Sequence, residues 1–113
     1  MFGTPAPALW AAAHYKMPFL MVVYQNRSYT TGTTRLNTAY PDGFAKRQNF
    51  DYEGGYFDPP IDFAREAEAA GAYGENVRDP NEIGEALKRG RSQIRRGTPA
   101  VISVRLPRIL KHD

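Results

Sequence analysis

Asn26 and Ser28 are the residues whose types and spacing first suggest chemistry, because they follow directly on an apolar run. An asparagine side-chain oxygen is a hard, neutral ligand of the kind that magnesium accepts, and a backbone carbonyl two residues later can reach the same ion. Backbone amides where the chain turns can hold a phosphate oxygen. Asn and Ser are also common turn formers, so a purely structural interpretation of this stretch stays open.

A buried strand is needed to position these two residues. The run Phe19 to Tyr24 is apolar on both faces, as is typical of a central strand in a parallel sheet. In open α/β sheets, ligands bind beyond the carboxyl ends of the strands, which is where Asn26 and Ser28 would lie. Upstream, Thr4 and Pro5 predict the start of an alanine-rich helix that reaches about residue 15 and is stopped by Pro18.

The rest of the chain alternates between helical and strand patterns. The predicted elements are a helix from Asp62 to Gly71, a strand over 73–77, a helix capped by Asp79 and ending at Gly97, and a strand over 99–106. This order predicts the α/β class: a partial three-layer domain with a mostly parallel sheet of about three strands, flanked by helices. Such domains normally open on a strand, so we expect one strand to be missing ahead of Met1.

The segment 27–60 separates the first predicted strand from the later elements. It is rich in Gly, Thr, Asn, Asp and Tyr, and its apolar residues follow no sustained period. We therefore expect a long loop at 27–60. A loop of this length in a compact domain is usually functional or lies against a partner.

Composition restricts the class of protein. The 113 residues suffice for one domain spanning 1–113, and no cysteine is present for disulfides, thiol catalysis or thiolate metal sites. The longest apolar run, 17–24, is far shorter than the roughly 18 residues of a membrane-spanning helix. The net charge is +3, but the late basic residues are separated from the aromatic ones, which favours a solvated helix face over nucleic-acid binding. We expect a cytoplasmic protein without a membrane or nucleic-acid partner.

The stretch FGTPAPALWAAAHYKMPFLMVVYQNRSY resembles the diphosphate-binding (PP-type) domain of thiamine-diphosphate-dependent enzymes, in the acetolactate synthase and benzoylformate decarboxylase superfamily. The resemblance continues through the later helices and the last strand. It implies that Asn26 matches a metal-binding asparagine and that Ser28 matches the position whose main-chain oxygen completes the protein ligands of Mg. Tyr29 matches the aromatic residue that follows and is expected to line the diphosphate pocket.

Departures from the family pattern limit what the chain is expected to do alone. The family's Gly-Asp-Gly motif, whose aspartate is the anionic metal ligand, occurs nowhere in the sequence. It would fall just ahead of Met1, in the missing strand, so we expect a truncated domain with half of the magnesium site. The family's activating glutamate lies on a separate pyrimidine-binding domain, so neither Glu53 nor Glu66 is expected to take that role. No catalytic residue is predicted in this chain.

Two functions follow from these observations. In the first, the chain is a fragment that binds the diphosphate/Mg end of thiamine diphosphate in a 2-keto acid decarboxylase or acetolactate synthase-like carboligase, inactive alone. Its partners would be the remainder of the parent enzyme or a neighbouring subunit carrying the pyrimidine-binding domain, in a homo-oligomer. In the second, it is a non-catalytic α/β interaction module without cofactor, which associates through the surface left by the missing strand.

Three further side chains are interpreted structurally. His14 is expected to be the cation of the last helical turn, and Trp10 and Tyr15 are expected to pack in the core or at an interface.

Overall fold

The structure, a computed structural model, describes residues 5–48 and 55–108, and these divide into two compact units. Of the described residues, the first unit contains 5–25 and 62–105, and the second contains 26–48, 55–61 and 106–108. The first unit carries the sheet, and the second carries the residues predicted to bind metal and diphosphate.

Three parallel strands form the sheet of the first unit. They are β1 (Leu20–Gln25), β2 (Tyr73–Val77) and β3 (Ala100–Arg105), in the order β1-β3-β2. In the register, Ala100 of β3 lies opposite Leu20 on one side and Tyr73 on the other. The predicted α/β class with a three-stranded parallel sheet is therefore confirmed.

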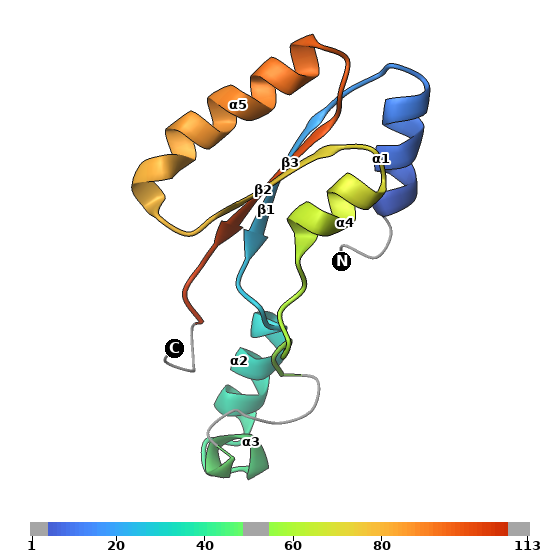
Figure 1. Cartoon of the computed structure of the whole chain (residues 1–113). Helices are drawn as coiled ribbons and strands as arrows, with labels where there is room; N and C mark the ends of the chain where they lie inside the picture. The colour runs from blue at the N-terminus through green and yellow to red at the C-terminus, as the bar shows by residue number, and fades with distance from the viewer. Residues whose placement is uncertain (1–4, 49–54, 109–113) are drawn as a thin grey trace. The chain divides into compact units, whose positions relative to one another are not determined.

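Helices cover both faces of this sheet. The helices α1 (Pro5–His14) and α4 (Phe63–Ala69) lie on one face, and α5 (Ile83–Arg95), entered through the short 3-10 turn η1 (Pro80–Glu82), lies on the other (Figure 1). Long crossover connections of this kind are what parallel strands require. The middle strand β3 is buried from Ala100 to Val104, as a strand covered on both faces should be.

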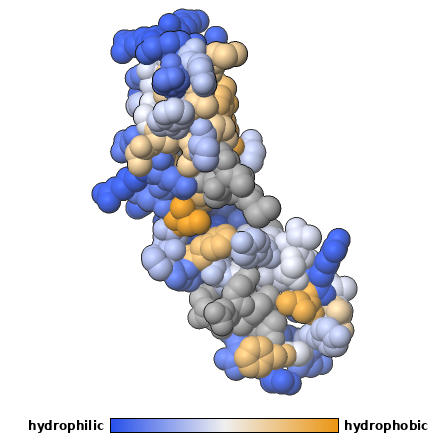
Figure 2. Space-filling model, turned by 90° about the vertical axis from the view of Figure 1, so that its right-hand side faces the viewer, coloured by the Kyte–Doolittle hydropathy of each residue, from blue (hydrophilic) through white to orange (hydrophobic). Residues whose placement is uncertain are grey.

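The core between the sheet and the helices α1 and α4 is built from small and medium apolar residues. Its fully packed members are Leu9, Ala67, Ala72 and Val101, and half-buried residues of β1 such as Met21 and Val23 pack around them. The alanines let the helices approach the sheet closely. Figure 2 faces this side of the sheet, and its upper part shows pale orange apolar surface bordered by blue polar surface.

Among the described strands, β3 takes the central place and β1 lies at an edge of the sheet. The prediction that β1 is a central strand includes a missing neighbouring strand, so it stays a prediction. Within the described residues, β1 pairs only with β3. The side chains of Val22 and Tyr24, which share one face of β1, are 37% and 71% exposed. The apolar run predicted the strand itself correctly, but a residue pattern does not record which neighbours flank a strand. The open edge matters for the function proposed below.

The end of α1 is set by a left-handed turn. Lys16 has a φ of 56°, and the amide of Met17 donates to the carbonyl of Ala12 at 3.0 Å. This is the six-to-one bond of a Schellman motif, which satisfies a carbonyl that the helix leaves free. The helix therefore ends before the predicted terminator, Pro18. The predicted N-cap, Thr4, lies outside the described residues.

The later helices begin and end where the sequence predicts. Asp62 caps α4 by accepting from the amide of Arg65 at 3.2 Å, and Asp79 caps η1 by accepting from the amide of Asn81 at 2.9 Å. The helices α4 and α5 are each followed, one residue after the C-cap, by a glycine in the left-handed conformation: Gly71 and Gly97 have φ values of 83° and 85°. Glycine adopts this backbone conformation without the steric cost that a Cβ imposes.

The segment 27–60 differs from the expected long loop. It contains α2 (Thr30–Ala39) and α3 (Phe44–Arg47), while residues 49–54 lie outside the described part. Threonine, glycine and asparagine have low helix propensity, which is why the sequence predicts a loop. Buried Thr33 holds the first turn of α2 despite this low propensity, because both its amide and its hydroxyl donate to the carbonyl of Tyr29, at 3.1 and 3.2 Å.

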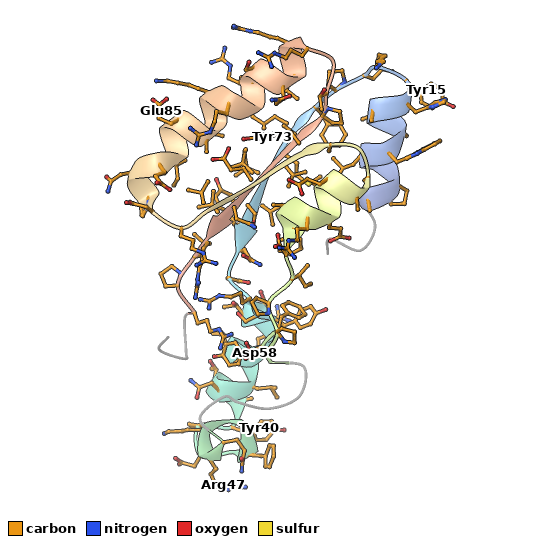
Figure 3. The ribbon with its side chains drawn as sticks, in the orientation of Figure 1. Tyr15, Tyr40, Arg47, Asp58, Tyr73 and Glu85 are labelled. Atoms are coloured by element: carbon orange, nitrogen blue, oxygen red, sulfur yellow. The ribbon has the colours of Figure 1, made fainter. Side chains whose placement is uncertain are left out.

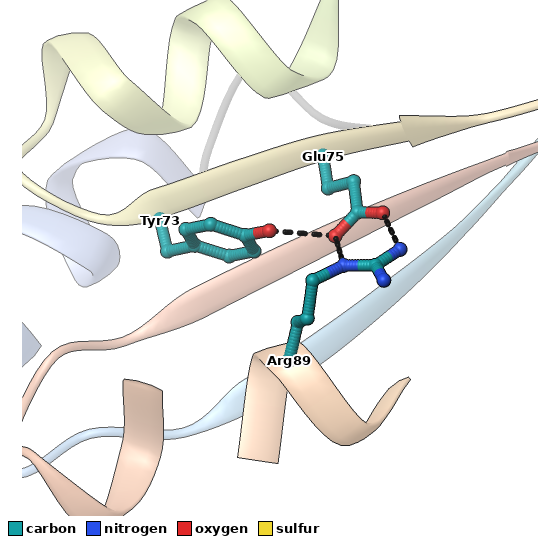
Figure 4. A network of polar contacts seen from close by, with 3 residues as sticks. All are labelled: Tyr73, Glu75 and Arg89. Carbon is teal, nitrogen blue, oxygen red and sulfur yellow. Dashed lines mark hydrogen bonds and ion pairs between the residues drawn. The ribbon is translucent and has the colours of Figure 1, made fainter. Parts of the chain in front are cut away.

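A polar network ties β2 to α5 (Figure 4). The guanidinium of Arg89 donates to both carboxylate oxygens of Glu75, at 3.1 and 2.6 Å, and the hydroxyl of Tyr73 donates to the same carboxylate at 2.6 Å. The bonds from Arg89, and then that from Tyr73, hold the pKa of Glu75 below its ordinary value against the opposing effect of burial. Burial, followed by the bond to Glu75, raises the pKa of Tyr73.

Replacing Gly74 with alanine should destabilise the first unit. A Cβ at this position of β2 would collide with the backbone carbonyl of Ala64 in α4. Backbone cannot move aside as a side chain can, so we expect a loss of about 2–3 kcal/mol in the free energy of unfolding, measured by chemical denaturation. The control is Gly84→Ala in α5, where a Cβ meets nothing within 4 Å. The control should gain about 0.5–1 kcal/mol, and equal effects of the two variants would contradict the close approach.

The Glu75 network should make stability fall in acid. A carboxyl group whose pKa is lower in the folded state stabilises the fold above its unfolded pKa, and this contribution is lost as the pH falls through the folded pKa. Glu75→Gln and Arg89→Gln should therefore lose less stability than the parent between about pH 6 and pH 3, measured by urea denaturation. The control is Arg95→Gln, which removes the same charge from α5 at a position without an ion pair in the described part. This variant should keep the acid dependence of the parent. A steep acid dependence retained in Glu75→Gln would refute this role.

Candidate functional site

Asn26, Ser28 and Thr30 form a closed set of hydrogen bonds directly after β1. The amide of Ser28 donates to Oδ1 of Asn26 at 3.1 Å, and Nδ2 of Asn26 donates to Oγ1 of Thr30 at 2.9 Å. The hydroxyls of Ser28 and Thr30 are 2.8 Å apart. Short polar side chains that bond to nearby backbone are what turns use. These residues therefore form a hydrogen-bonded turn, as the structural interpretation expects, and the bonds fix the orientation of the Asn26 side-chain amide.

A single antiparallel bridge between Ser28 and Tyr56 holds this segment in place. The carbonyl of Arg27 accepts from the amide of Phe57 at 2.8 Å, and the amide of Tyr29 donates to the carbonyl of Gly55 at 3.1 Å. These bonds flank the bridge, so the amide and carbonyl of Ser28 itself face away from Tyr56. The amide of Ser28 donates to Oδ1 of Asn26, so Oδ1 lies on the side of Ser28 that faces away from Tyr56. The carbonyl of Ser28 lies on the same side.

Arg27 shapes the turn between these two oxygens. Its φ of 58° is left-handed, which is uncommon for a residue with a Cβ, and its side chain is 7% exposed. Nη2 of Arg27 donates to the carbonyl of Leu106 at 3.4 Å. The turn is thus held by its own side chain as well as by its backbone.

Tyr29 stands at the start of α2, where no group of the described residues accepts from the first helical amides. It is the N-cap residue, but its side chain makes no capping bond, and its ring packs edge-on against Phe57 with centroids 4.9 Å apart. The ring is 56% exposed. The first amides of a helix have no partner within the helix and carry partial positive charge, so the start of α2 suits an anion such as a phosphate oxygen. The predicted contact of Tyr29 with a diphosphate stays a prediction.

The oxygens of this segment fit a magnesium ion as part of its ligands. Oδ1 of Asn26 accepts one hydrogen bond and keeps a second lone pair, and no backbone amide of the described residues donates to the carbonyl of Ser28. Both are the hard, neutral oxygens that magnesium accepts. No cluster of three or more His, Cys, Asp or Glu side chains suited to a metal occurs among the described residues. The pair therefore fits the ion but does not complete its ligand set.

The sequence interpretation missed two contributors to this segment. Thr30 bonds to both Asn26 and Ser28, and its only sequence signal is a spacing of four residues from Asn26. Arg108 contacts Tyr56 and Asp58, the latter labelled in Figure 3. Arg108 is 80 residues beyond Ser28, so no local pattern connects the two.

The remaining singled-out residues lie elsewhere. His14 is in the last turn of α1, as predicted, and its ring stacks on Trp10 at a centroid distance of 5.0 Å. Trp10 and Tyr15 are 57% and 68% exposed, so neither is a core residue, and the interface interpretation stays a prediction for both. Glu66 lies on α4 of the first unit, whereas Glu53 is outside the described residues.

Comparison with known proteins identifies the family. Within the described residues, no helix is both long and apolar enough to span a membrane. No solved structure matches the chain. The family model described as "Thiamine pyrophosphate enzyme, C-terminal TPP binding domain" matches residues 1–104, which include the polar segment after β1 and the whole sheet except Arg105 at the end of β3. The chain therefore belongs to the family of C-terminal thiamine-diphosphate-binding domains of thiamine-diphosphate-dependent enzymes.

Proposed function

We propose that this chain binds the diphosphate end of thiamine diphosphate through magnesium, as part of a 2-keto acid decarboxylase or acetolactate synthase-like carboligase. The carrying observation is the Ser28–Tyr56 bridge, which turns the carbonyl of Ser28 to the same edge as Oδ1 of Asn26. When bound, the cofactor supplies a nucleophilic thiazolium carbon for reactions of 2-keto acids. The residues of this chain anchor the opposite end of the cofactor and so set its position.

Each residue of the segment has a distinct part in this proposal. Asn26 and Ser28 supply two neutral oxygens to the metal, and Thr30 keeps Oδ1 of Asn26 turned outward by accepting from Nδ2. The open amides at the start of α2 hold a phosphate oxygen, and the exposed ring of Tyr29 lines the diphosphate pocket. Magnesium commonly completes its octahedron with substrate phosphates and water, which a short ligand set of this kind permits.

The open edge of β1 supports the proposal that a further strand completes the domain. The sequence of β1 is that of a central strand, yet its edge away from β3 has no neighbour among the described residues. Unpaired backbone and exposed apolar side chains on such an edge favour strand addition. We propose that the added strand ends in a Gly-Asp-Gly motif. Its aspartate would offset part of the positive charge of the metal ion, which the two neutral oxygens do not reduce.

The catalytic partner lies outside this chain in the same proposal. The activating carboxylate would come from a pyrimidine-binding domain, in the remainder of the parent enzyme or in a neighbouring subunit of a homo-oligomer. The exposed aromatic rings of Trp10 on α1 and of Tyr15 directly after it suit such an interface. By itself the chain would then bind without turning over a substrate.

Asn26→Ala should weaken magnesium-dependent cofactor binding in a protein that carries the complete site. Removing Oδ1 takes away one metal ligand, and we expect an affinity for thiamine diphosphate at least about tenfold lower at fixed magnesium. Calorimetric titration with and without a chelator measures the loss. The control Asn37→Ala removes the same side chain from α2 at a position away from the segment.

An unchanged affinity in Asn26→Ala would overturn the metal assignment. If the complete protein bound no cofactor even with magnesium present, the alternative of a non-catalytic α/β interaction module would take its place. Binding that survives the chelator would equally contradict a magnesium bridge.

Thr30→Val should produce a smaller loss of the same kind. Valine keeps the shape of threonine but cannot accept from Nδ2 of Asn26 or bond to the hydroxyl of Ser28. The Asn26 amide would then be held only by the bond from the amide of Ser28 to Oδ1, and more magnesium would be needed for the same cofactor occupancy. Thr31→Val, on the next and exposed residue of α2, is the matched control. Equal magnesium requirements in the two variants would show that Thr30 does not orient Asn26.

A further inference from the structure

Arg108, in the tail that follows β3, is almost fully buried although it carries a charge. Its side chain is 7% exposed, Nη2 lies 2.7 Å from Oδ1 of Asp58, and its guanidinium carbon lies 5.0 Å from the ring centroid of Tyr56. A buried cation is stable only where it is paired, and a guanidinium can pair with a carboxylate while it stacks on an aromatic ring. Arg108 therefore fastens the tail to the segment 56–58.

The segment that Arg108 holds is the one that supports the proposed metal ligands. Phe57 donates to the carbonyl of Arg27, and Gly55 accepts from the amide of Tyr29, so the two hydrogen bonds lie on either side of Ser28. The edge-on contact between Tyr29 and Phe57 adds a side-chain contact to this pairing. Displacement of the segment 55–58 would release Ser28 from its bridge.

A second contact joins the same tail directly to the turn between the ligands. The carbonyl of Leu106 accepts from Nη2 of Arg27, the buried residue that separates Asn26 from Ser28. Residues 106–108, here called the tail clip, thus contact both strands of the bridge: Leu106 meets Arg27, and Arg108 meets Tyr56 and Asp58. All of these residues belong to the second unit.

We propose that the tail clip positions the magnesium-binding turn, with Arg108 as a positioning residue that acts through Tyr56 and Asp58. The tail clip lies beyond the residues matched by the family model, which end at 104. It is therefore a feature of this chain that the family assignment does not supply. The inference rests on the proposed function of Asn26 and Ser28, because positioning has meaning only if these oxygens bind the metal.

Amide hydrogen exchange on the 113-residue chain, without any ligand, tests whether Arg108 holds the segment 55–58 in its pairing with Ser28. Arg108→Ala should speed the exchange of the Tyr29 and Phe57 amides about tenfold, because an ion pair and a cation–π contact are lost. The amides of Val101 and Ile102 in β3 should keep their exchange rates and so report that the first unit stays folded. The matched control is Arg35→Ala, which removes an exposed arginine from α2 of the same unit. Unchanged exchange at Tyr29 and Phe57 would overturn the inference.

A double substitution tests whether Arg108 acts through Asp58. Asp58→Asn removes the carboxylate charge, so it should speed the same two amides to a lesser degree. Combined with Arg108→Ala it should add nothing, because both substitutions remove one shared contact. Additive increases in exchange would show that the two residues act separately, which would contradict the clip.

A binding measurement separates the inference from the proposed function. In the holoenzyme that contains this domain, Arg108→Ala should raise the magnesium concentration needed for half-maximal thiamine diphosphate binding, while Arg35→Ala should not. Faster exchange combined with an unchanged magnesium requirement would overturn the positioning role and leave the Asn26 assignment intact. Failure of the unsubstituted holoenzyme to bind the cofactor would instead refute the proposed function.

Discussion

The pairing of Ser28 with Tyr56 is the interaction on which the geometry after β1 depends. An isolated bridge has only two flanking hydrogen bonds, from Phe57 to Arg27 and from Tyr29 to Gly55, and each contributes about 1 kcal/mol net. Such a bridge does not persist by itself, so neighbouring contacts must add to it. The buried guanidinium of Arg27, the ring contact between Tyr29 and Phe57, and the contact of Arg108 with the Tyr56 ring are among these contacts.

The bridge also explains how one short segment can be both a turn and a ligand-bearing edge. Turn formation uses the amide of Ser28 and one lone pair of Oδ1 in Asn26, together with the hydroxyl groups of Ser28 and Thr30. It leaves the carbonyl of Ser28, which faces away from Tyr56, and the second lone pair of Oδ1 without a hydrogen bond among the described residues. The structural and the functional interpretation of these residues are therefore compatible, because they use different backbone groups of Ser28 and different lone pairs of Oδ1 in Asn26.

Local sequence signals predicted the parts of the fold that local physics decides. The caps at Asp62 and Asp79, the glycine ends at Gly71 and Gly97, and the strand over 73–77 all depend on residues within a few positions of one another. The order of strands depends on packing at long range, so the sequence pattern did not predict that β3 lies between β1 and β2. The helix α2 has poor intrinsic propensity and forms in its tertiary setting, where Thr33 is buried. The contribution of Arg108 likewise has no local signal.

In the proposed function, charge balance would account for a metal site divided between this chain and other segments. Magnesium and a diphosphate together need hard oxygens and at least partial neutralisation, and an acidic ligand would supply both. The outward edge after β1 supplies only the neutral oxygens of Asn26 and Ser28. A parallel strand added at the open edge of β1 would end at the same edge of the sheet as β1 does, since parallel strands share their direction. In the proposed function, an aspartate at its end would supply the negative charge that the neutral oxygens of Asn26 and Ser28 lack.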